Sequence, residues 1–234
     1  MKALDAIIFD FDGVIADSEP LHYEAFRRTL ADDGVDLSRD DYYALYLGYD
    51  DHGFAVALAR DRGLAGGAAW ADDFVGRKGR VLLELLDSGA VLFAGAAEFV
   101  RAAAHRVPVA IASGARTHEI LQIVEAAGLR ACFTTIVGAD DTSESKPSPE
   151  PYRLAFARLL EATGRALSPD RTVAIEDSQW GLDSARGAGL RLVGVTTSYA
   201  AETLQGAELV IPGLASLDLD ALDTLCARPR ERTA

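Results

Sequence analysis

The chain has 234 residues, of which 49% are hydrophobic and 25% are charged, values that are typical of a globular protein and exclude disordered or collagen-like chains. Its formal net charge of −13, from 36 acidic and 23 basic residues, disfavours binding to nucleic acid. No apolar run approaches the roughly 18 residues that span a bilayer, and Asp5 interrupts the apolar core that a signal peptide would need.

Short apolar runs alternate along the chain with longer segments of helical period. The first run, Ala6–Phe9, ends at Asp10, and the later runs are Val107–Ala112, Thr135–Val137, Thr172–Ile175, Arg191–Val195 and Glu208–Ile211. The helical segments between them include Ala96–Ala104, Thr117–Ala127 and Pro151–Thr163. The runs are apolar at both odd and even positions, which is typical of strands covered on both faces. We therefore predict an α/β fold with a Rossmann-like, doubly wound parallel sheet.

One long stretch interrupts this alternation. From about Ser18 to about Ser88 the sequence shows helical periodicity and no convincing strand. The candidate helices are Leu21–Leu30, Asp40–Leu47, Phe54–Arg62 and Trp70–Leu86. We expect a small α-helical cap domain over residues 17–89, inserted into a core formed by residues 1–16 and 90–234.

Polar residues follow four of the predicted strands, at the edge of an open parallel sheet where ligands bind. Each group alone is also what an ordinary turn or helix cap contains. Together they place two pairs of acids, a hydroxyl and a lysine at one edge. In chain order they are Asp10 and Asp12 with Gly13, then Ser113 with Gly114, then Lys146, then Glu176 with Asp177.

This combination of side chains suits phosphoryl transfer. Carboxylates from two strands are hard oxygen ligands of the kind that Mg²⁺ prefers. A lysine ammonium and a serine hydroxyl can hold phosphoryl oxygens. One aspartate can act as nucleophile through an aspartyl-phosphate, and a neighbouring aspartate can act as acid and then as base. The lysine is notable because the chain has only three, Lys2, Lys78 and Lys146.

In this order, the four groups resemble the four motifs of the haloacid dehalogenase (HAD) superfamily. The motifs read Asp10-Phe11-Asp12-Gly13-Val14, Ser113-Gly114, Lys146-Pro147 and Glu176-Asp177-Ser178. The helical insert after the first motif resembles the cap of the first subfamily. Three longer segments resemble the branch that holds β-phosphoglucomutase and sugar-phosphate phosphatases: Asp17-Ser18-Glu19-Pro20-Leu21-His22, Lys146 to Tyr152 and Glu176 to Gly181.

The resemblance implies a role for each motif residue. Asp10 would be the nucleophile and Asp12 the general acid and base, and the presence of Asp12 argues against a dehalogenase, which lacks this second acid. Mg²⁺ would be held by Asp10, the backbone carbonyl of Asp12 and Asp177, with Glu176 either bound to the ion or one hydrogen bond removed from it. The transferring phosphoryl group would be bound by three further residues, Ser113, Gly114 and Lys146.

Two cap residues are further candidates for substrate binding. His22 lies near the expected hinge of the cap, where the family often has histidine; it either touches substrate or packs. Lys78 belongs to a basic cluster with Arg77 and Arg80 on the last cap helix, and the alternative interpretation of that cluster is a solvated helix face.

The predicted function is a Mg²⁺-dependent HAD phosphatase acting on a small phosphorylated metabolite, a sugar or a related organic phosphate. The main alternative is a β-phosphoglucomutase-type phosphomutase, but the mutase has a cap arginine shortly after a Leu-x-Gly turn, where this chain has Asp50 and Asp51. A phospho-accepting receiver domain is about half as long and orders its motifs differently. A non-catalytic phospho-ligand-binding protein would be expected to have damaged motifs, and these are intact.

The expected setting is the cytoplasm. Cys132 and Cys226 have no metal-ligand spacing and are too few for a disulfide framework, as in a protein of a reducing compartment. We expect no membrane or nucleic-acid partner, and no obligate protein partner is inferred.

Overall fold

A computed structural model describes residues 3–86 and 92–229 of the chain. The chain divides into two compact units. One, called here the core unit, comprises Met1–Asp17 and Val91–Ala234, and the other, called the cap unit, comprises Ser18–Ala90. The boundary predicted between residues 89 and 90 lies outside the described residues.

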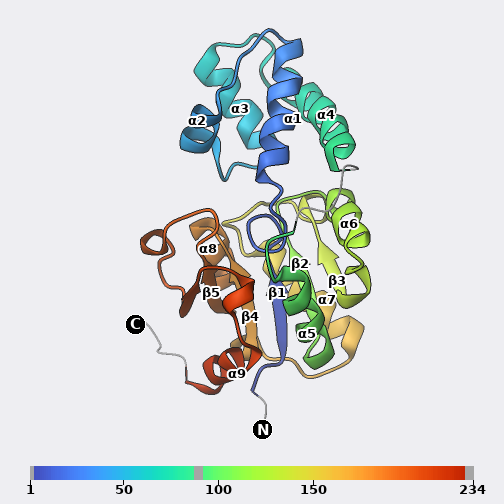
Figure 1. Cartoon of the computed structure of the whole chain (residues 1–234), viewed down its shortest axis with the longest axis vertical. Coiled ribbons are helices and arrows are strands. Elements are labelled where there is room, and N and C mark those ends of the chain that lie inside the picture. Colours follow the sequence, from blue (N-terminus) through green and yellow to red (C-terminus); the bar gives the residue numbers. More distant parts are fainter. Residues whose placement is uncertain (1–2, 87–91, 230–234) are drawn as a thin grey trace. The chain divides into compact units, whose positions relative to one another are not determined.

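The core unit contains one six-stranded sheet in which every pair of neighbouring strands is parallel (Figure 1). The strands are β1 (Ala6–Phe9), β2 (Val109–Ala112), β3 (Thr135–Val137), β4 (Thr172–Glu176), β5 (Arg191–Val195) and β6 (Leu209–Ile211). Their order is β3-β2-β1-β4-β5-β6, so the direction of winding reverses between β1 and β4. In such sheets the ligand crevice lies beyond the carboxyl ends of the strands at this reversal. The predicted doubly wound α/β fold is confirmed.

Helices cover both faces of the sheet. They are α5 (Ala96–Arg106), α6 (Thr117–Ala126), α7 (Glu150–Thr163), α8 (Gln179–Gly187) and α9 (Leu219–Ala227). Helices α7 and α8 pack on one face, where Ile8 of β1 is buried in a cluster with Tyr152 and Leu182. Helices α5 and α9 pack against β2 and β4, and Phe9 of β1 meets the ring of Phe99 edge-on. Alternate residues of one strand therefore face two different apolar layers, as its continuous apolar run predicts.

The observed bounds differ from the predicted ones by a few residues at the element ends. Strand β2 begins at Val109 rather than at Val107, because Pro108 has no backbone N–H to contribute to the sheet ladder. Strand β4 extends one residue further than predicted and ends with Glu176. This extension matters for the site, because it makes Glu176 a fully buried strand residue rather than part of a loop.

The cap unit consists of helices packed around aromatic rings. The elements are α1 (Glu19–Asp32), α2 (Arg39–Asp41), a π-helical segment (Tyr42–Tyr46), α3 (Asp51–Arg62) and α4 (Gly67–Leu86). Helix α4 packs on both α1 and α3. Phe54 of α3 stacks on Phe26 of α1 with ring centroids 3.9 Å apart, and Phe74 of α4 lies 6.1 Å from each of these rings. The single helix predicted over Asp40–Leu47 is instead a short α-helical turn followed by the π-helical segment.

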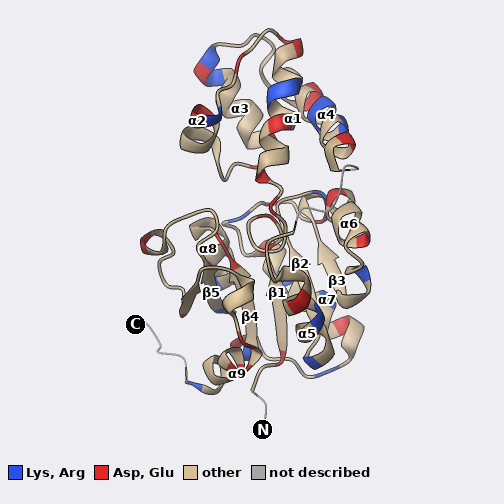
Figure 2. Cartoon of the chain, viewed as in Figure 1, with Lys and Arg blue, Asp and Glu red and all other residues tan. Residues whose placement is uncertain are grey.

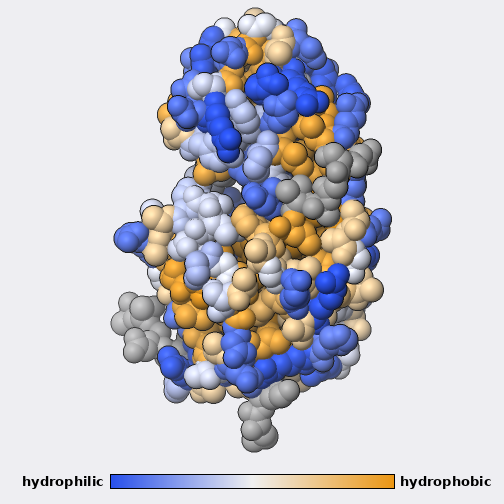
Figure 3. Space-filling view, viewed as in Figure 1, coloured by the Kyte–Doolittle hydropathy of each residue, from blue (hydrophilic) through white to orange (hydrophobic). Residues whose placement is uncertain are grey.

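Charged residues of both signs are interspersed on the helices of both units (Figure 2). Hydrophilic residues predominate on the face of the cap unit shown in Figure 3, which agrees with the aromatic rings being gathered inside that unit. None of the helices in the described ranges is both long enough and apolar enough to cross a membrane.

Candidate active site

The first motif forms a tight loop at the end of β1. The backbone N–H of Asp10 donates to the carbonyl of Ile175 at 2.9 Å, which continues the pairing of β1 with β4 beyond Phe9. Gly13 has φ +81°, and a β-carbon there would overlap the carboxylate of Asp177. Glycine is thus required at this position for two reasons, the left-handed backbone and the close approach of the fourth motif.

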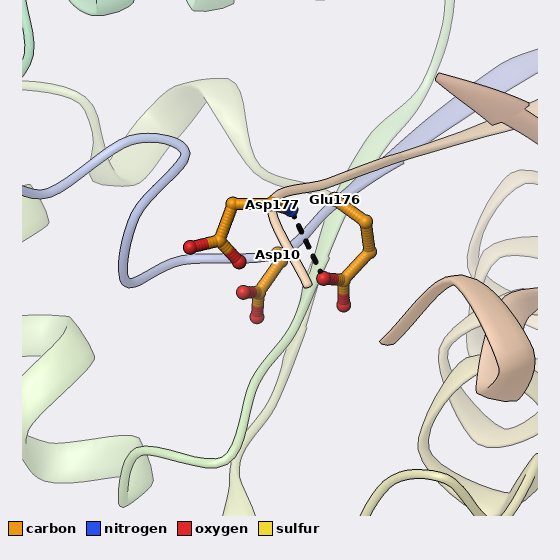
Figure 4. Close-up of side chains that lie close together, drawn as sticks. All are labelled: Asp10, Glu176 and Asp177. Atoms are coloured by element: carbon orange, nitrogen blue, oxygen red, sulfur yellow. Dashed lines mark hydrogen bonds between the residues drawn. The ribbon is translucent and has the colours of Figure 1, made fainter. Parts of the chain in front are cut away.

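Three buried carboxylates meet beyond the ends of β1 and β4 (Figure 4). They belong to Asp10, Glu176 and Asp177, and one oxygen of each lies within 4.8 Å of the others. Asp10 comes from the end of β1, Glu176 is the last residue of β4, and Asp177 follows it. We call this group the carboxylate cluster. Two adjacent parallel strands bring it together because their carboxyl ends lie at the same edge of the sheet.

Lys146 places its ammonium group against this cluster. Its Nζ donates to Oδ1 of Asp10 at 2.7 Å and to Oε1 of Glu176 at 2.6 Å, and it lies 5.1 Å from the centre of the Tyr152 ring. The Tyr152 hydroxyl donates to the same Glu176 oxygen at 2.9 Å. Lys146 is thus held by two carboxylates and one aromatic face, which fixes its charge beside the end of β1.

Glu176 is the most completely engaged of the three acids. Its Oε1 accepts from Lys146 and Tyr152, and its Oε2 accepts from the backbone N–H of Asp177 and from the hydroxyl of Ser178. A β-carbon at Gly181 would overlap this carboxylate, so a glycine in α8 makes room for it. Both oxygens therefore have protein donors, and Glu176 anchors Lys146 and the start of the fourth motif.

The electrostatics of the cluster are unbalanced. Burial raises the pKa of Asp10 to about 7, and the Glu176 carboxylate adds to the rise while Lys146 opposes it. Burial also raises the pKa of Asp177 well above its usual range, reinforced by Asp10 and Glu176. Burial disfavours the charged form of Lys146, but the two carboxylates beside it outweigh this effect and raise its pKa. One ammonium thus faces three carboxylates, and the metal-free site is short of positive charge.

This donor set fits a hard divalent cation. Carboxylate oxygens within one small buried volume are the ligands that such ions prefer. A divalent ion would offset both the burial and the mutual repulsion that raise the pKa of Asp10 and Asp177. The carboxylate of Asp12 is not part of the cluster among the residues that the structure describes. Asp12 lies three residues beyond the end of β1, is half-buried and forms a backbone bridge with Ala16.

The second motif follows β2, the strand next to β1. Phe9 of β1 pairs with Ile111 of β2. Asp10 lies one residue beyond this pair, and Ser113 lies two residues beyond it. Ser113 is buried, its backbone N–H donates to Val137, and its hydroxyl accepts from the N–H of Ala115 at 3.0 Å. Gly114 is exposed between them. The structure therefore brings residues of all four motifs to the same edge of the sheet.

The two cap candidates, His22 and Lys78, contact each other within the cap unit. Lys78 is fully buried on α4, and its Nζ donates to Oδ1 of Asp51 at 2.7 Å and lies 2.9 Å from Nδ1 of His22. An ammonium can only donate, so Nδ1 of His22 accepts and its proton is on Nε2. Burial, reinforced by the Lys78 charge, lowers the pKa of His22 to about 3, which keeps the ring neutral. Contact of these residues with substrate stays a prediction.

The basic residues of α4 do not form a single charged surface. Arg77 is partly exposed and pairs with Asp33 and Asp73, Arg80 is exposed, and Lys78 is buried. For Lys78 the interpretation as part of a solvated helix face is wrong. The helical period contains the signal, because position 78 continues the buried series of Ala71, Phe74, Val75 and Leu82.

Sequence reasoning did not identify three residues that contact the candidate site residues. Tyr152 and Asp51 hold Glu176 and Lys78 respectively. The third, Ser198, follows β5 and donates a hydrogen bond from its hydroxyl to Asp177. The rule that ligands bind beyond the carboxyl ends of strands would have pointed to Ser198 if it had been applied to β5 as well as to the four preceding strands.

Comparison with known proteins gives the family. The family model for haloacid dehalogenase-like hydrolases matches residues 4–189. The chain is 33% identical over 233 residues to the protein CbbY of Rhodobacter capsulatus, covering 95% of this chain and 99% of that protein. It is 30% identical to a phosphorylated carbohydrates phosphatase of Thermotoga maritima, with 83% and 87% of the two chains covered.

A solved structure is similar over the same extent. The crystal structure of CbbY from Rhodobacter sphaeroides in complex with phosphate has a TM-score of 0.83 and 30% identity, covering 94% of this chain and 99% of that one. A second structure of that protein is a complex with xylulose-(1,5)bisphosphate. These matches confirm the resemblance found in the motifs. The chain is an enzyme that belongs to the haloacid dehalogenase-like hydrolase family.

Proposed function

We propose that the protein is a Mg²⁺-dependent phosphatase that hydrolyses a small phosphorylated sugar, or a related organic phosphate, through an aspartyl-phosphate. The observation that carries this proposal is the arrangement of Asp10, a buried carboxylate at the end of β1, between the ammonium of Lys146 and the carboxylate of Asp177. A nucleophile, a fixed positive charge and an oxygen ligand set at one strand end are the parts that phosphoryl transfer through an acid requires.

Asp10 is proposed as the nucleophile. One of its oxygens would bond to phosphorus while the bond from phosphorus to the substrate oxygen breaks, and water would then displace the carboxylate from phosphorus. The attacking form is the anion, and the Lys146 ammonium at 2.7 Å favours that form. The same ammonium lies where negative charge accumulates on the transferring group, so Lys146 stabilises both the nucleophile and the phosphoryl oxygens.

Asp12 is proposed as the general acid and then the general base. It lies two residues beyond Asp10, and its carboxylate is not a member of the carboxylate cluster. Its proton would pass to the leaving alcohol oxygen, and the resulting carboxylate would take a proton from the water that attacks the aspartyl-phosphate. Separate environments for Asp10 and Asp12 are what allow one acid to be ionised while the other is protonated.

Mg²⁺ is proposed to be held by Asp10, Asp177 and the backbone carbonyl of Asp12. Glu176 has protein donors on both oxygens, so its proposed role is to hold Lys146 rather than to bind the ion. The bound ion would supply charge that offsets the negative charge of the cluster and of the phosphoryl group. Ser113 and the backbone at Gly114 are proposed to bind phosphoryl oxygens beside Lys146.

The substrate class rests on the relatives. One relative is named a phosphorylated carbohydrates phosphatase, and another has been crystallised with xylulose-(1,5)bisphosphate. For the alternative, a phosphomutase, the cap would need a positive charge for a second phosphate. At the corresponding stretch Asp50 accepts from the N–H of Gly53 at the start of α3, and Asp51 pairs with Lys78. These acids favour a phosphatase over a mutase.

The test is phosphate release from a panel of sugar phosphates and related organic phosphates, each with MgCl₂ and with a chelator. The panel includes β-glucose 1-phosphate primed with the corresponding bisphosphate. Mg²⁺-dependent phosphate release is the expected result and identifies the substrate class. Isomerisation of the glucose phosphate without phosphate release would establish the mutase instead. No turnover of any member by a protein that binds Mg²⁺ would contradict both enzymatic proposals.

A further inference from the structure

The loop that follows β5 links the first and fourth motifs. The hydroxyl of Thr197 donates to the carbonyl of Gly13, and the hydroxyl of Ser198 donates to Oδ2 of Asp177. The loop itself is tied to β6, because the backbone N–H of Thr196 donates to the carbonyl of Ile211 at 3.0 Å. Two consecutive hydroxyls therefore bind the two loops that supply the proposed metal ligands.

These contacts treat the two oxygens of Asp177 differently. Oδ2 accepts from Ser198, and it is also the oxygen that a β-carbon at Gly13 would overlap. The side of the carboxylate that carries Oδ2 is therefore closed off by Ser198 and the Gly13 backbone. Figure 4 shows the two Asp177 oxygens diverging, with one directed toward Asp10. Oδ1, which does not accept from Ser198, is therefore the better placed of the two oxygens to bind a cation together with Asp10.

We propose that Ser198 is a positioning residue that makes Asp177 bind the cation through a single oxygen and thereby favours Mg²⁺ over Ca²⁺. The inference rests on the proposed function, because it takes the carboxylate cluster to be the Mg²⁺ site. Mg²⁺ is small, takes six ligands in near-octahedral geometry and suits carboxylates that bind through one oxygen. Ca²⁺ takes six to eight ligands at longer distances and readily uses both oxygens of one carboxylate.

Removal of the Ser198 hydroxyl should change this preference in a defined direction. Without its donor, Oδ2 of Asp177 loses its hydrogen bond, and the carboxylate can turn so that both oxygens face the ion. Such a site offers one more oxygen in a less fixed geometry, so its affinity for Mg²⁺ falls. Its affinity for Ca²⁺ falls by less than this, or rises. Donors that hold a metal ligand typically affect metal affinity by about 10- to 100-fold.

The experiment is calorimetric titration of the metal-free full chain with MgCl₂ and, separately, with CaCl₂. The variants are Ser198→Ala, which removes the donor, and Ser198→Thr, which keeps it. The matched control is Thr196→Val in the same loop, whose hydroxyl lies 3.5 Å from the carbonyl of Ile211 in β6. We expect the ratio of the Ca²⁺ to the Mg²⁺ dissociation constant to fall about 10-fold in Ser198→Ala. Ser198→Thr and Thr196→Val should keep the wild-type ratio.

The outcomes separate this inference from the proposal beneath it. An unchanged ratio in a folded Ser198→Ala variant, with Mg²⁺ bound normally by the wild type, overturns the inference alone. Equal loss of both ions also overturns it, because that result means general damage to the site. Failure of the wild type to bind Mg²⁺ overturns the proposed function and this inference with it. If Ser198→Ala does not fold, Ser198→Cys keeps most of the volume with a much weaker donor and carries the same expectation.

Discussion

Among the residues that the structure describes, each unit has one lysine that contacts carboxylates, and the two lysines differ in what surrounds the charge. In the core unit Lys146 contacts Asp10 and Glu176, and Asp177 lies beside them, so three carboxylates share one ammonium. In the cap unit Lys78 contacts a single carboxylate, Asp51, and a histidine that its environment keeps neutral. The first group carries excess negative charge, whereas the second is balanced.

This difference indicates which of the two groups, the one around Lys146 or the one around Lys78, needs a ligand. Buried ion pairs are tolerated when charge and hydrogen bonds are matched, as they are around Lys78. Excess buried charge is unfavourable, and a protein retains it where a cation or substrate completes the site. Burial, reinforced by the Glu176 carboxylate, raises the pKa of Asp10, and burial, reinforced by the Lys78 charge, lowers the pKa of His22.

The largest expected effect comes from Asp10→Asn, which removes one carboxylate from the cluster. Phosphate release should fall below detection, because an amide cannot form the aspartyl-phosphate. The metal-free variant should also unfold at a higher temperature than the metal-free wild type at neutral pH, because one of the mutually repelling buried carboxylates is gone. The two measurements are phosphate release with MgCl₂ and thermal unfolding in chelator.

A matched control is Asp183→Asn, a carboxylate of the same unit that pairs with Arg186 outside the cluster. It should alter neither measurement appreciably, since exposed pairs contribute about 0–1 kcal/mol. Substantial turnover by folded Asp10→Asn would disprove its role as nucleophile. A metal-free Asp10→Asn that is less stable than wild type would disprove the excess of negative charge.

The next effect is that of Asp12→Asn, an acid close to the cluster in sequence but outside it. Loss of proton transfer should slow hydrolysis of an alkyl phosphate by about 10²- to 10⁴-fold. Hydrolysis of p-nitrophenyl phosphate should slow much less, because its leaving group needs no proton. The measurement is kcat/KM for both substrates. Equal losses on the two substrates would mean that Asp12 positions the loop rather than transferring a proton.

The core site was predictable from the sequence because topology alone gathers it. Asp10 and Glu176–Asp177 follow apolar runs, and parallel strands must place those ends at one edge. The cap was predictable only as helices. The partner of Lys78, Asp51, lies on another helix, and helical periodicity shows that position 78 is buried without showing what faces it. The π-helical segment Tyr42–Tyr46 similarly carries no distinguishing period.

The carboxylate cluster of the core unit and the group of His22, Asp51 and Lys78 in the cap unit should change the stability of the protein with pH in opposite directions. Asp10 has a pKa of about 7 in the folded metal-free chain against 3.8 for an ordinary aspartate, so the folded state holds a proton that the unfolded chain has released. The contribution of Asp10 to the free energy of unfolding therefore falls as pH rises from about 4 to about 7. His22 has a pKa of about 3 against 6.5, so the unfolded chain binds the extra proton, and stability falls as pH drops below about 6.5.

Thermal unfolding in chelator across this pH range, for the wild type, Asp10→Asn and His22→Gln, separates the two contributions. The difference between wild type and Asp10→Asn should widen toward neutral pH, and MgCl₂ should abolish it there. The difference between wild type and His22→Gln should change at acid pH and be insensitive to MgCl₂. A difference for Asp10→Asn that is the same at all pH values would contradict the raised pKa.

The smallest effect distinguishes the two ways of breaking the balanced pair in the cap. Asp51→Asn leaves a fully buried ammonium facing an amide and a neutral imidazole, and should destabilise the protein by about 3 kcal/mol. Lys78→Met should cost less, because the Asp51 side chain is 24% exposed and its charge reaches water.

Urea unfolding measures both changes, and the double variant shows whether the loss in Asp51→Asn comes from the unpaired Lys78 charge. The control is Asp41→Asn, whose partner Arg62 is exposed and whose loss should cost less than about 1 kcal/mol. If Asp51→Asn costs no more than this control, the Lys78 charge does not need Asp51. The charges of Lys78 and Asp51 in the cap unit would then not balance each other, and this group would be a further candidate for a ligand site.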